Sequence, residues 1–173
     1  MCGQAVRVAD SLRPVTSVKL DHLDYAILDR LQRDARTIAE LIAVEVGLST
    51  AAVQRRIKRL RETGVIAREV AVLSPKALGL AMTFIVEVEM EHERPEVLEE
   101  FRARMDADAH VQQCYYVTGS HDFVLIVTTR DMADFDTFTQ RTFFGNTNVR
   151  RFTTSVVMRP AKVGLTLPLP ARP

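Results

Sequence analysis

A run of basic and amide side chains recurs at helical spacing shortly before residue 60. At about 100° per residue these side chains share one face of a helix, and they are Ala51, Gln54, Arg55, Lys58 and Arg59. Small residues at the start of a helix allow close approach to DNA, Gln and Arg can hydrogen-bond base edges, and cations farther along can contact phosphates. The face therefore predicts a helix that binds the major groove, with Ser49 and Thr50 contributing at its first turn.

Two further amphipathic helices are predicted before this basic helix. The first is capped by Asp21 and has an apolar face at helical spacing, formed by Leu23, Ile27, Leu28 and Leu31. Thr37, followed three residues later by Glu40, has the pattern of a capping box and predicts the start of the second helix. Gly47 ends that helix, and Ser49 is placed to cap the third. The sequence thus predicts a helix-turn-helix over about residues 37–63.

A basic helix face is more often a solvated surface than a DNA-binding one, so the face alone does not decide between the two. Here Val53, Ile57 and Leu60 would pack the helix against two others after a short glycine turn, the geometry in which a helix projects into the major groove. The charge distribution agrees with this. Residues 1–68 hold 12 Lys and Arg against 8 Asp and Glu, while residues 69–173 hold 11 against 14.

The rest of the chain predicts an α+β domain with the order β-α-β-β-α-β. The strands and helices are expected over residues 81–91, 95–105, 111–118, 123–128, 131–143 and 152–158. This order is typical of a ferredoxin-like four-stranded antiparallel sheet with two helices on one face. Val124 and Ile126 would point to the face without helices, and a second subunit is the simplest cover for them.

Length and composition exclude several classes of protein. At 173 residues, with 47% apolar and 26% charged residues, the chain predicts one compact domain or two small ones. No apolar run is long enough to cross a bilayer, and Arg7, Asp10 and Arg13 stand where a signal peptide needs an apolar stretch. Cys2 and Cys114 are too few for a disulfide scaffold, so we expect free thiols in a cytoplasmic protein without membrane contact.

Catalytic and metal sites are not expected. Four residues close together in the sequence have side chains that can ligate a metal: His110, Cys114, His121 and Asp122. Their positions along one strand and at its ends instead favour a buried cysteine and exposed histidines. No nucleophile with a base beside it, Gly-rich phosphate loop, HExxH or CxxC pattern occurs. The sequence therefore indicates a protein that is not an enzyme and has no cofactor.

Several motifs, in order and at matching separations, resemble the leucine-responsive/asparagine-regulator (Lrp/AsnC) family of transcriptional regulators. The resemblance runs from Leu20 to about Leu167 and is carried by residues 20–28, 34–36, 46–49, 53–60, 64–66, 73–75, 78–79 and 117–125. It implies a (winged) helix-turn-helix domain over residues 20–68 after a flexible segment 1–19. An interdomain strand or linker over 69–80 and a ligand-sensing and oligomerisation domain over 81–173 would follow. Ile38 departs from the small polar helix cap that is common in the family, and Thr37 is expected to take that role.

The resemblance also implies partners and an effector site. Family members bind double-stranded DNA, form homodimers that often assemble into octamers, and bind amino acids or related effectors between dimers. By this likeness the effector residues are Thr118, Gly119, Ser120, His121 and Asp122, with Thr154 a weaker candidate. The Asp122 carboxylate could pair with an α-ammonium group, while hairpin amides could hold an α-carboxylate.

Three functions fit these observations. The first is a sequence-specific regulator that responds to an amino acid, and the second is a ligand-independent architectural protein that wraps DNA. The third is a small-molecule-binding or enzymatic module with an appended helical domain. A thermal-shift panel of amino acids separates the first two, because a ligand that binds only the folded state raises the melting temperature. DNA binding itself separates both from the third.

Overall fold

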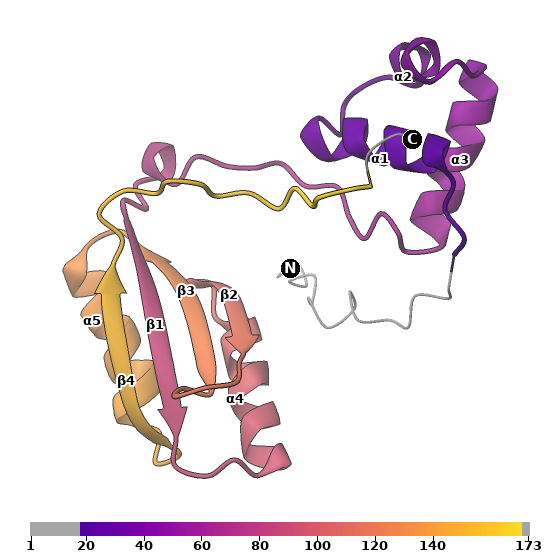
Figure 1. The fold of residues 1–173 in the computed structure, drawn as a ribbon. Helices are drawn as coiled ribbons and strands as arrows, with labels where there is room; N and C mark the ends of the chain where they lie inside the picture. The colour runs from indigo at the N-terminus through magenta and orange to yellow at the C-terminus, as the bar shows by residue number, and fades with distance from the viewer. Residues whose placement is uncertain (1–17, 171–173) are drawn as a thin grey trace, which may run out of the picture. The chain divides into compact units, whose positions relative to one another are not determined.

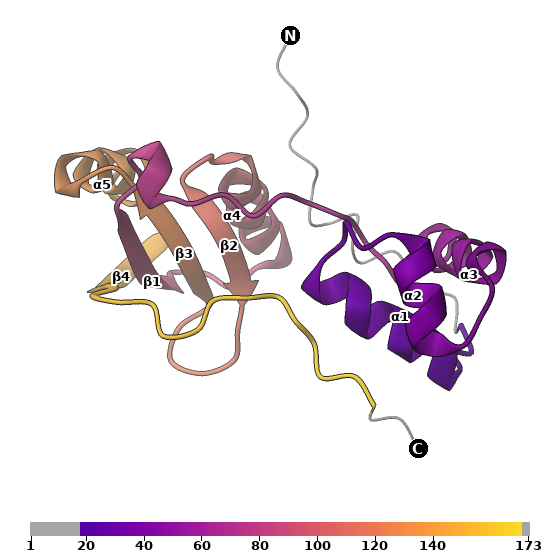
Figure 2. The same cartoon turned by 90° about the horizontal axis from the view of Figure 1, so that it is seen from above.

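The computed structural model describes residues 18–170, which form two compact units. The helical unit comprises residues 18–71 together with 162–170, and the sheet unit comprises residues 72–161. Figures 1 and 2 show the helices of the first unit and the sheet of the second from two directions. The expectations for Cys2 and for the segment 1–17 lie outside the described residues. Within residues 18–170, no helix is long and apolar enough to cross a membrane.

Three helices build the helical unit: α1 (His22–Arg33), α2 (Ala39–Val46) and α3 (Thr50–Glu62). Their apolar faces meet in one core, whose fully buried members are Ile27, Ile42, Val53 and Leu60. Asp21 caps α1 in a capping box with Asp24, and Ser49 caps α3. Gly47 ends α2 with a φ of +71°, a conformation that favours glycine. The predicted helix-turn-helix and its glycine turn are confirmed.

The start of α2 differs from the expected capping box. Ile38 is the N-cap and makes no side-chain hydrogen bond to the helix. The Thr37 hydroxyl instead donates to the backbone oxygen of Asp34 at 2.8 Å, and the Thr37 amide donates to the same oxygen. Because the turn after α1 uses Thr37, the prediction that Thr37 caps α2 is wrong.

The sheet unit has the predicted β-α-β-β-α-β order. Its elements are β1 (Met82–Met90), α4 (Pro95–Ala107), β2 (Val111–Tyr116), β3 (Phe123–Thr129), α5 (Met132–Thr139) and β4 (Val149–Val156). The four strands are antiparallel in the order β2-β3-β1-β4, so β1 and β3 are central. Strand β4 begins three residues earlier than expected, and α5 continues into a π-helical turn, η3 (Gln140–Phe144).

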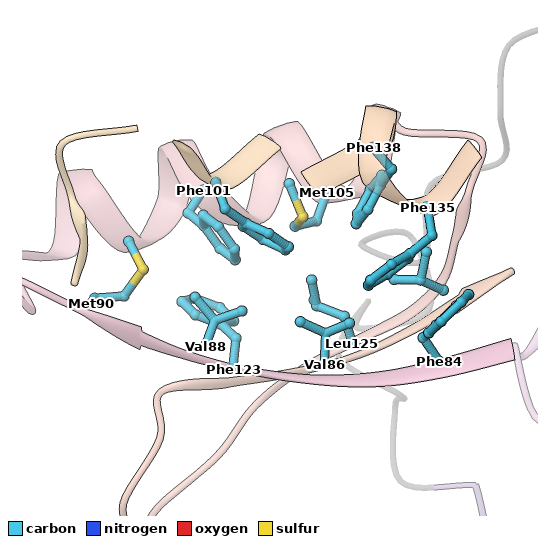
Figure 3. Packing of buried hydrophobic residues seen from close by; sticks show 12 residues of the cluster. Phe84, Val86, Val88, Met90, Phe101, Met105, Phe123, Leu125, Phe135 and Phe138 are labelled. Atoms are coloured by element: carbon cyan, nitrogen blue, oxygen red, sulfur yellow. The ribbon is translucent and has the colours of Figure 1, made fainter. Parts of the chain in front are cut away.

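The core of this unit lies between the sheet and its two helices, as Figure 3 shows. Alternate residues of β1 point into it: Phe84, Val86, Val88 and Met90 are buried. Phe84 stacks on Phe135 of α5 with ring centroids 3.7 Å apart. The helices therefore cover the face of β1 that carries the alternating apolar residues predicted from the sequence.

The opposite face of the sheet carries apolar side chains without a covering helix. Ile85 and Tyr115 are 37% and 50% exposed, and Val124 and Ile126 are half-buried. Ile85 pairs with Ile126, and Tyr115 pairs with Val124, so these side chains form one continuous strip across three strands. The expectation that the helix-free face is partly apolar is confirmed.

Two segments, one between α3 and β1 and one after β4, contain no α-helix or β-strand. Residues 65–75 form no strand, and a short 3-10 turn, η2 (Lys76–Leu78), precedes β1. Residues 162–170 group with the helical unit, although we expected them in the ligand-sensing domain. Their attachment is a reciprocal pair of hydrogen bonds between the Gln32 side-chain amide and the Leu167 backbone, at 3.2 and 3.0 Å.

Candidate nucleic-acid interface and effector hairpin

Helix α3 exposes the side chains that the sequence singled out for DNA binding. Exposed positions are Ser49, Ala51, Gln54, Arg55, Lys58 and Arg59, and Thr50 is half-buried. The opposite face, with Val53, Ile57 and Leu60, is buried in the core of the helical unit. The core therefore fixes which side of α3 is turned outward.

The cations of α3 differ in their partners. Within the described part of the chain, the Arg55 guanidinium has no hydrogen bond or ion pair. Lys58 is 76% exposed and lies 3.7 Å from Glu62, an exposed i,i+4 pair that contributes little. Arg55 and Lys58 are thus the two α3 cations most available to a nucleic acid.

Arg56 and Arg59 face a different partner, a buried carboxylate on α1. The Arg56 Nη1 donates to Asp24 Oδ1 at 2.8 Å, and the Arg59 Nη2 donates to Asp24 Oδ2 at 2.5 Å. The same Arg56 nitrogen also donates to both carboxylate oxygens of Asp21. The Asp24 side chain is 1% exposed, and a buried charge is costly unless it is paired. The two arginines supply the compensating positive charge.

This ion-pair network shifts the ionisation of its more exposed members. Burial by itself would raise the pKa of Asp21, but hydrogen bonds from the Asp24 amide and from Arg56 outweigh it and hold the pKa below 3.8. Hydrogen bonds to Asp24 and Asp21 raise the pKa of Arg56 above its ordinary value. Both groups remain charged at neutral pH.

Sequence reasoning missed Asp24 and Arg56, although a signal was present. Asp24, Ile27 and Leu31 follow one another at helical spacing and are the buried residues of α1. A carboxylate inside an apolar stripe requires a buried partner. The neighbouring basic helix carries several arginines, so the pattern could have indicated a partner on that helix but not which arginine it is.

The predicted effector residues occupy the hairpin between β2 and β3. Thr118, Gly119 and Ser120 are exposed, and Gly119 has a φ of +129°, which favours glycine. The Ser120 hydroxyl lies 3.0 Å from His121 Nδ1. Five consecutive predicted residues, 118–122, are therefore brought together at one end of the sheet.

Asp122 anchors this hairpin to β1. Its backbone amide donates to the Val88 oxygen at 2.9 Å, and its carboxylate Oδ2 accepts from the Met90 amide at 2.6 Å. Among residues 18–170, the other carboxylate oxygen, Oδ1, has no hydrogen bond. One oxygen is thus used within the protein and one remains for a ligand.

Thr154 lies away from the hairpin in this chain. It pairs with Val86 in the middle of β1, and β4 is the edge strand opposite β2. The Thr154 hydroxyl oxygen is buried and has no hydrogen-bond partner in the described residues. A single copy of the chain therefore does not bring Thr154 together with residues 118–122.

The residues weighed for a metal site also lie apart. His110 Nδ1 lies 3.2 Å from Asp108 and 3.3 Å from Arg141, away from the hairpin that holds His121. Cys114 is half-buried, and burial raises the pKa of its thiol to about 11, so it is protonated at neutral pH. Among the described residues, no group of three His, Cys, Asp or Glu is placed to hold a metal ion.

Comparisons with known proteins match both units. Residues 20–61 match the AsnC-type helix-turn-helix domain, and residues 83–166 match the Lrp/AsnC ligand binding domain. An uncharacterised HTH-type transcriptional regulator of Sinorhizobium fredii is 42% identical over 88% of this chain and 90% of its own length. The leucine-responsive regulatory protein of Haemophilus influenzae is 34% identical over 83% of this chain and 86% of its own.

Solved structures agree with these matches. A transcriptional regulator of Neisseria meningitidis in complex with L-methionine superposes with a TM-score of 0.81 at 28% identity, covering 87% of this chain and 97% of that chain. An AsnC-family regulator of Agrobacterium tumefaciens gives the same TM-score at 32% identity, covering 86% of this chain and 97% of its own. These relatives are regulators rather than enzymes.

Proposed function

Because this chain belongs to the Lrp/AsnC family of transcriptional regulators, we propose that α3 binds the major groove of operator DNA and that the hairpin of the sheet unit binds an amino-acid effector. The observation that carries the DNA-binding part is the outward face of α3. That face presents Gln54, Arg55 and Lys58 to solvent, while the other side of the helix is buried in the core.

The roles of these side chains follow from their chemistry. Arg55 has no partner within the described residues, and its planar guanidinium can donate two parallel hydrogen bonds to a guanine. Lys58 provides a point charge for a phosphate. Ser49, Thr50 and Ala51 are small residues in the first turn and allow α3 to approach the bases.

A homodimer supplies the second recognition helix. The strip of Ile85, Tyr115, Val124 and Ile126 on the helix-free face of the sheet provides an apolar surface that a second copy would cover. Two α3 helices related by a two-fold axis would contact half-sites about one DNA turn apart. We extend the proposal to a higher assembly such as an octamer, acting in the cytoplasm.

The effector assignment is supported by the hairpin and by a structural relative. The regulator of Neisseria meningitidis was solved with L-methionine bound. In this chain the free Oδ1 of Asp122 could accept from an α-ammonium group, and the amides of residues 118–121 could donate to an α-carboxylate. Thr154 would join such a site only if a second copy brought it there.

Two measurements test the proposal. A duplex is selected by the protein from a random-sequence pool, and its affinity is compared with that of a scrambled duplex of the same composition. Preference for the selected duplex supports a sequence-specific regulator, and equal affinity contradicts it. A thermal-shift panel of the twenty amino acids then separates an effector-responsive regulator, which shows a raised melting temperature with at least one of them, from a ligand-independent architectural protein, which shows none.

A further inference from the structure

We propose that Asp24 is a positioning residue for DNA recognition, which sets the rotation of α3 about its axis by holding Arg56 and Arg59. This inference rests on the proposed DNA-binding function of α3. It concerns a residue on α1 that is buried and does not touch DNA itself.

The geometry makes the Asp24 carboxylate a two-point attachment for α3. Each of its oxygens accepts from a different arginine, at 2.8 Å from Arg56 and 2.5 Å from Arg59. Those arginines are three residues apart on α3, almost one helical turn, so the two bonds fix both the height and the rotation of the helix. The apolar core fixes which side of α3 is buried, and the two directional bonds to Asp24 narrow the rotation that this core still allows.

The bonds to Asp24 also determine which cations of α3 remain available to DNA. Arg55 and Lys58 each precede one of the paired arginines, and one residue corresponds to about 100° of rotation around a helix. Arg56 and Arg59 are bonded to Asp24 on α1, whereas Arg55 and Lys58 are exposed and, within the described residues, make no bond to Asp24. Loss of the attachment would free Arg56 and Arg59 and widen the rotation of α3 that its apolar core allows, so Arg55 and Lys58 would be positioned less precisely against a duplex.

Burial makes the attachment hard to release. Asp24 is 1% exposed, and an unpaired carboxylate in that position would be strongly destabilising. The Asp24 amide also donates to Asp21 Oδ1 in the capping box, and Asp21 in turn accepts from Arg56. The cap of α1 and the orientation of α3 are therefore parts of one hydrogen-bonded network.

A purely electrostatic role for Asp24 predicts effects of a different sign. Replacing Asp24 with Asn removes a negative charge near the duplex, so electrostatics alone would strengthen binding to every DNA sequence. Replacing Arg59 with Met removes a positive charge and would weaken binding to every sequence. A positioning role instead predicts that both substitutions lower the preference for the selected duplex, although their charge changes are opposite.

The experiment uses the full chain and the selected and scrambled duplexes. The variants are Asp24→Asn, Arg59→Met and the double variant, with Asp29→Asn as a control that makes the same charge change on α1 at an i,i+4 surface pair. We expect the ratio of the two affinities to fall about tenfold in each of the first two variants and in the double variant, and to stay unchanged in the control. An unchanged ratio in Asp24→Asn and Arg59→Met overturns the proposal.

Hydrogen exchange without DNA separates this inference from the proposed function. We expect faster exchange over residues 50–62 in Asp24→Asn and in Arg59→Met but not in Asp29→Asn. Arg59→Met leaves Asp24 paired with Arg56, so it remains informative if Asp24→Asn fails to fold. If the parent shows no preference between duplexes, the proposed function fails. In that case faster exchange still assigns the positioning of α3 to Asp24, and unchanged exchange overturns it.

Discussion

The Asp122 carboxylate accepts a hydrogen bond from the backbone amide of Met90 at 2.6 Å and joins the β2–β3 hairpin to the end of β1. The ladder between β1 and β3 ends at Val88 and Phe123, so Met90 has no backbone acceptor on β3. Met90 is 5% exposed, and a buried amide without a partner is costly. Asp122 therefore has a structural role in the same hairpin that is proposed to bind the effector.

Substitution of Asp122 can separate these two roles. Asp122→Ala removes the acceptor for the Met90 amide, and we expect the free energy of unfolding to fall by about 1–3 kcal/mol. Asp122→Asn keeps an acceptor oxygen but loses the negative charge, so stability should be largely restored while the amino-acid response is lost. Urea denaturation and the thermal-shift panel measure the two effects. A full amino-acid response in Asp122→Asn would remove the Asp122 charge from the effector site.

Arg55 and Lys58 are expected to contribute differently to DNA binding. Arg55→Ala should cost about 1–3 kcal/mol at the selected duplex and relax base preference, whereas Lys58→Ala should weaken both duplexes similarly and reduce the salt slope by about one. Affinities at several salt concentrations test this. Arg102→Ala, which removes a cation of an exposed pair on α4, is the control for net charge. Parent-like binding by both α3 variants would contradict the assignment of the DNA-facing side.

Local patterns in the sequence were sufficient for most elements of the fold. The helical periodicity of α3, the alternation in β1 and the caps at Asp21 and Ser49 each depend on residues a few positions apart. The same reasoning failed at Thr37, because the preceding turn competes for its hydroxyl. A local pattern does not show which of two nearby backbone groups a side chain will bind.

The exact partners in contacts between distant parts of the chain were beyond sequence reasoning. Arg56 and Asp24 are 32 residues apart, and so are Met90 and Asp122. Each contact depends on how two elements dock, which periodicity does not specify. For the site, the outward residues of α3 and the continuous hairpin 118–122 could be named in advance. Which α3 cations pair with Asp24 and which face solvent could not be named in advance.

The turn of the helix-turn-helix should be sensitive to a single methyl group. Gly47 has a φ of +71°, and Gly47→Ala is expected to lower the free energy of unfolding by about 1–2 kcal/mol because of backbone strain. No atom lies within 4 Å of the added Cβ, so steric contact contributes nothing. Gly145→Ala, where φ is −89° and the added Cβ is equally free, is the control and should not destabilise. Equal melting behaviour of both variants would contradict the assigned strain.

Acid stability of the sheet unit should depend on Asp134. Hydrogen bonds from the Arg130 side chain and amide hold the pKa of Asp134 far below its ordinary value of 3.8. A carboxylate with a lowered folded-state pKa stabilises the protein above its unfolded pKa, and this stabilisation is lost as the pH falls toward the folded value. The unfolding free energy should therefore fall below about pH 4 in the parent and less steeply in Asp134→Asn. A parent-like slope in Asp134→Asn would contradict the prediction.

The C-terminal segment should depend on Gln32 for its position on the helical unit. The Gln32 side-chain amide both donates to and accepts from the Leu167 backbone, and only an amide of this length and geometry satisfies both groups at once. Gln32→Ala removes both bonds at a cost of roughly 1 kcal/mol, and we expect amide exchange around residue 167 to become about fivefold faster. Gln54→Ala, an exposed glutamine of the same unit, is the matched control and should leave this exchange unchanged. Exchange at the parent rate in Gln32→Ala would show that the segment is held by other contacts, of which the half-buried Leu169 is the candidate.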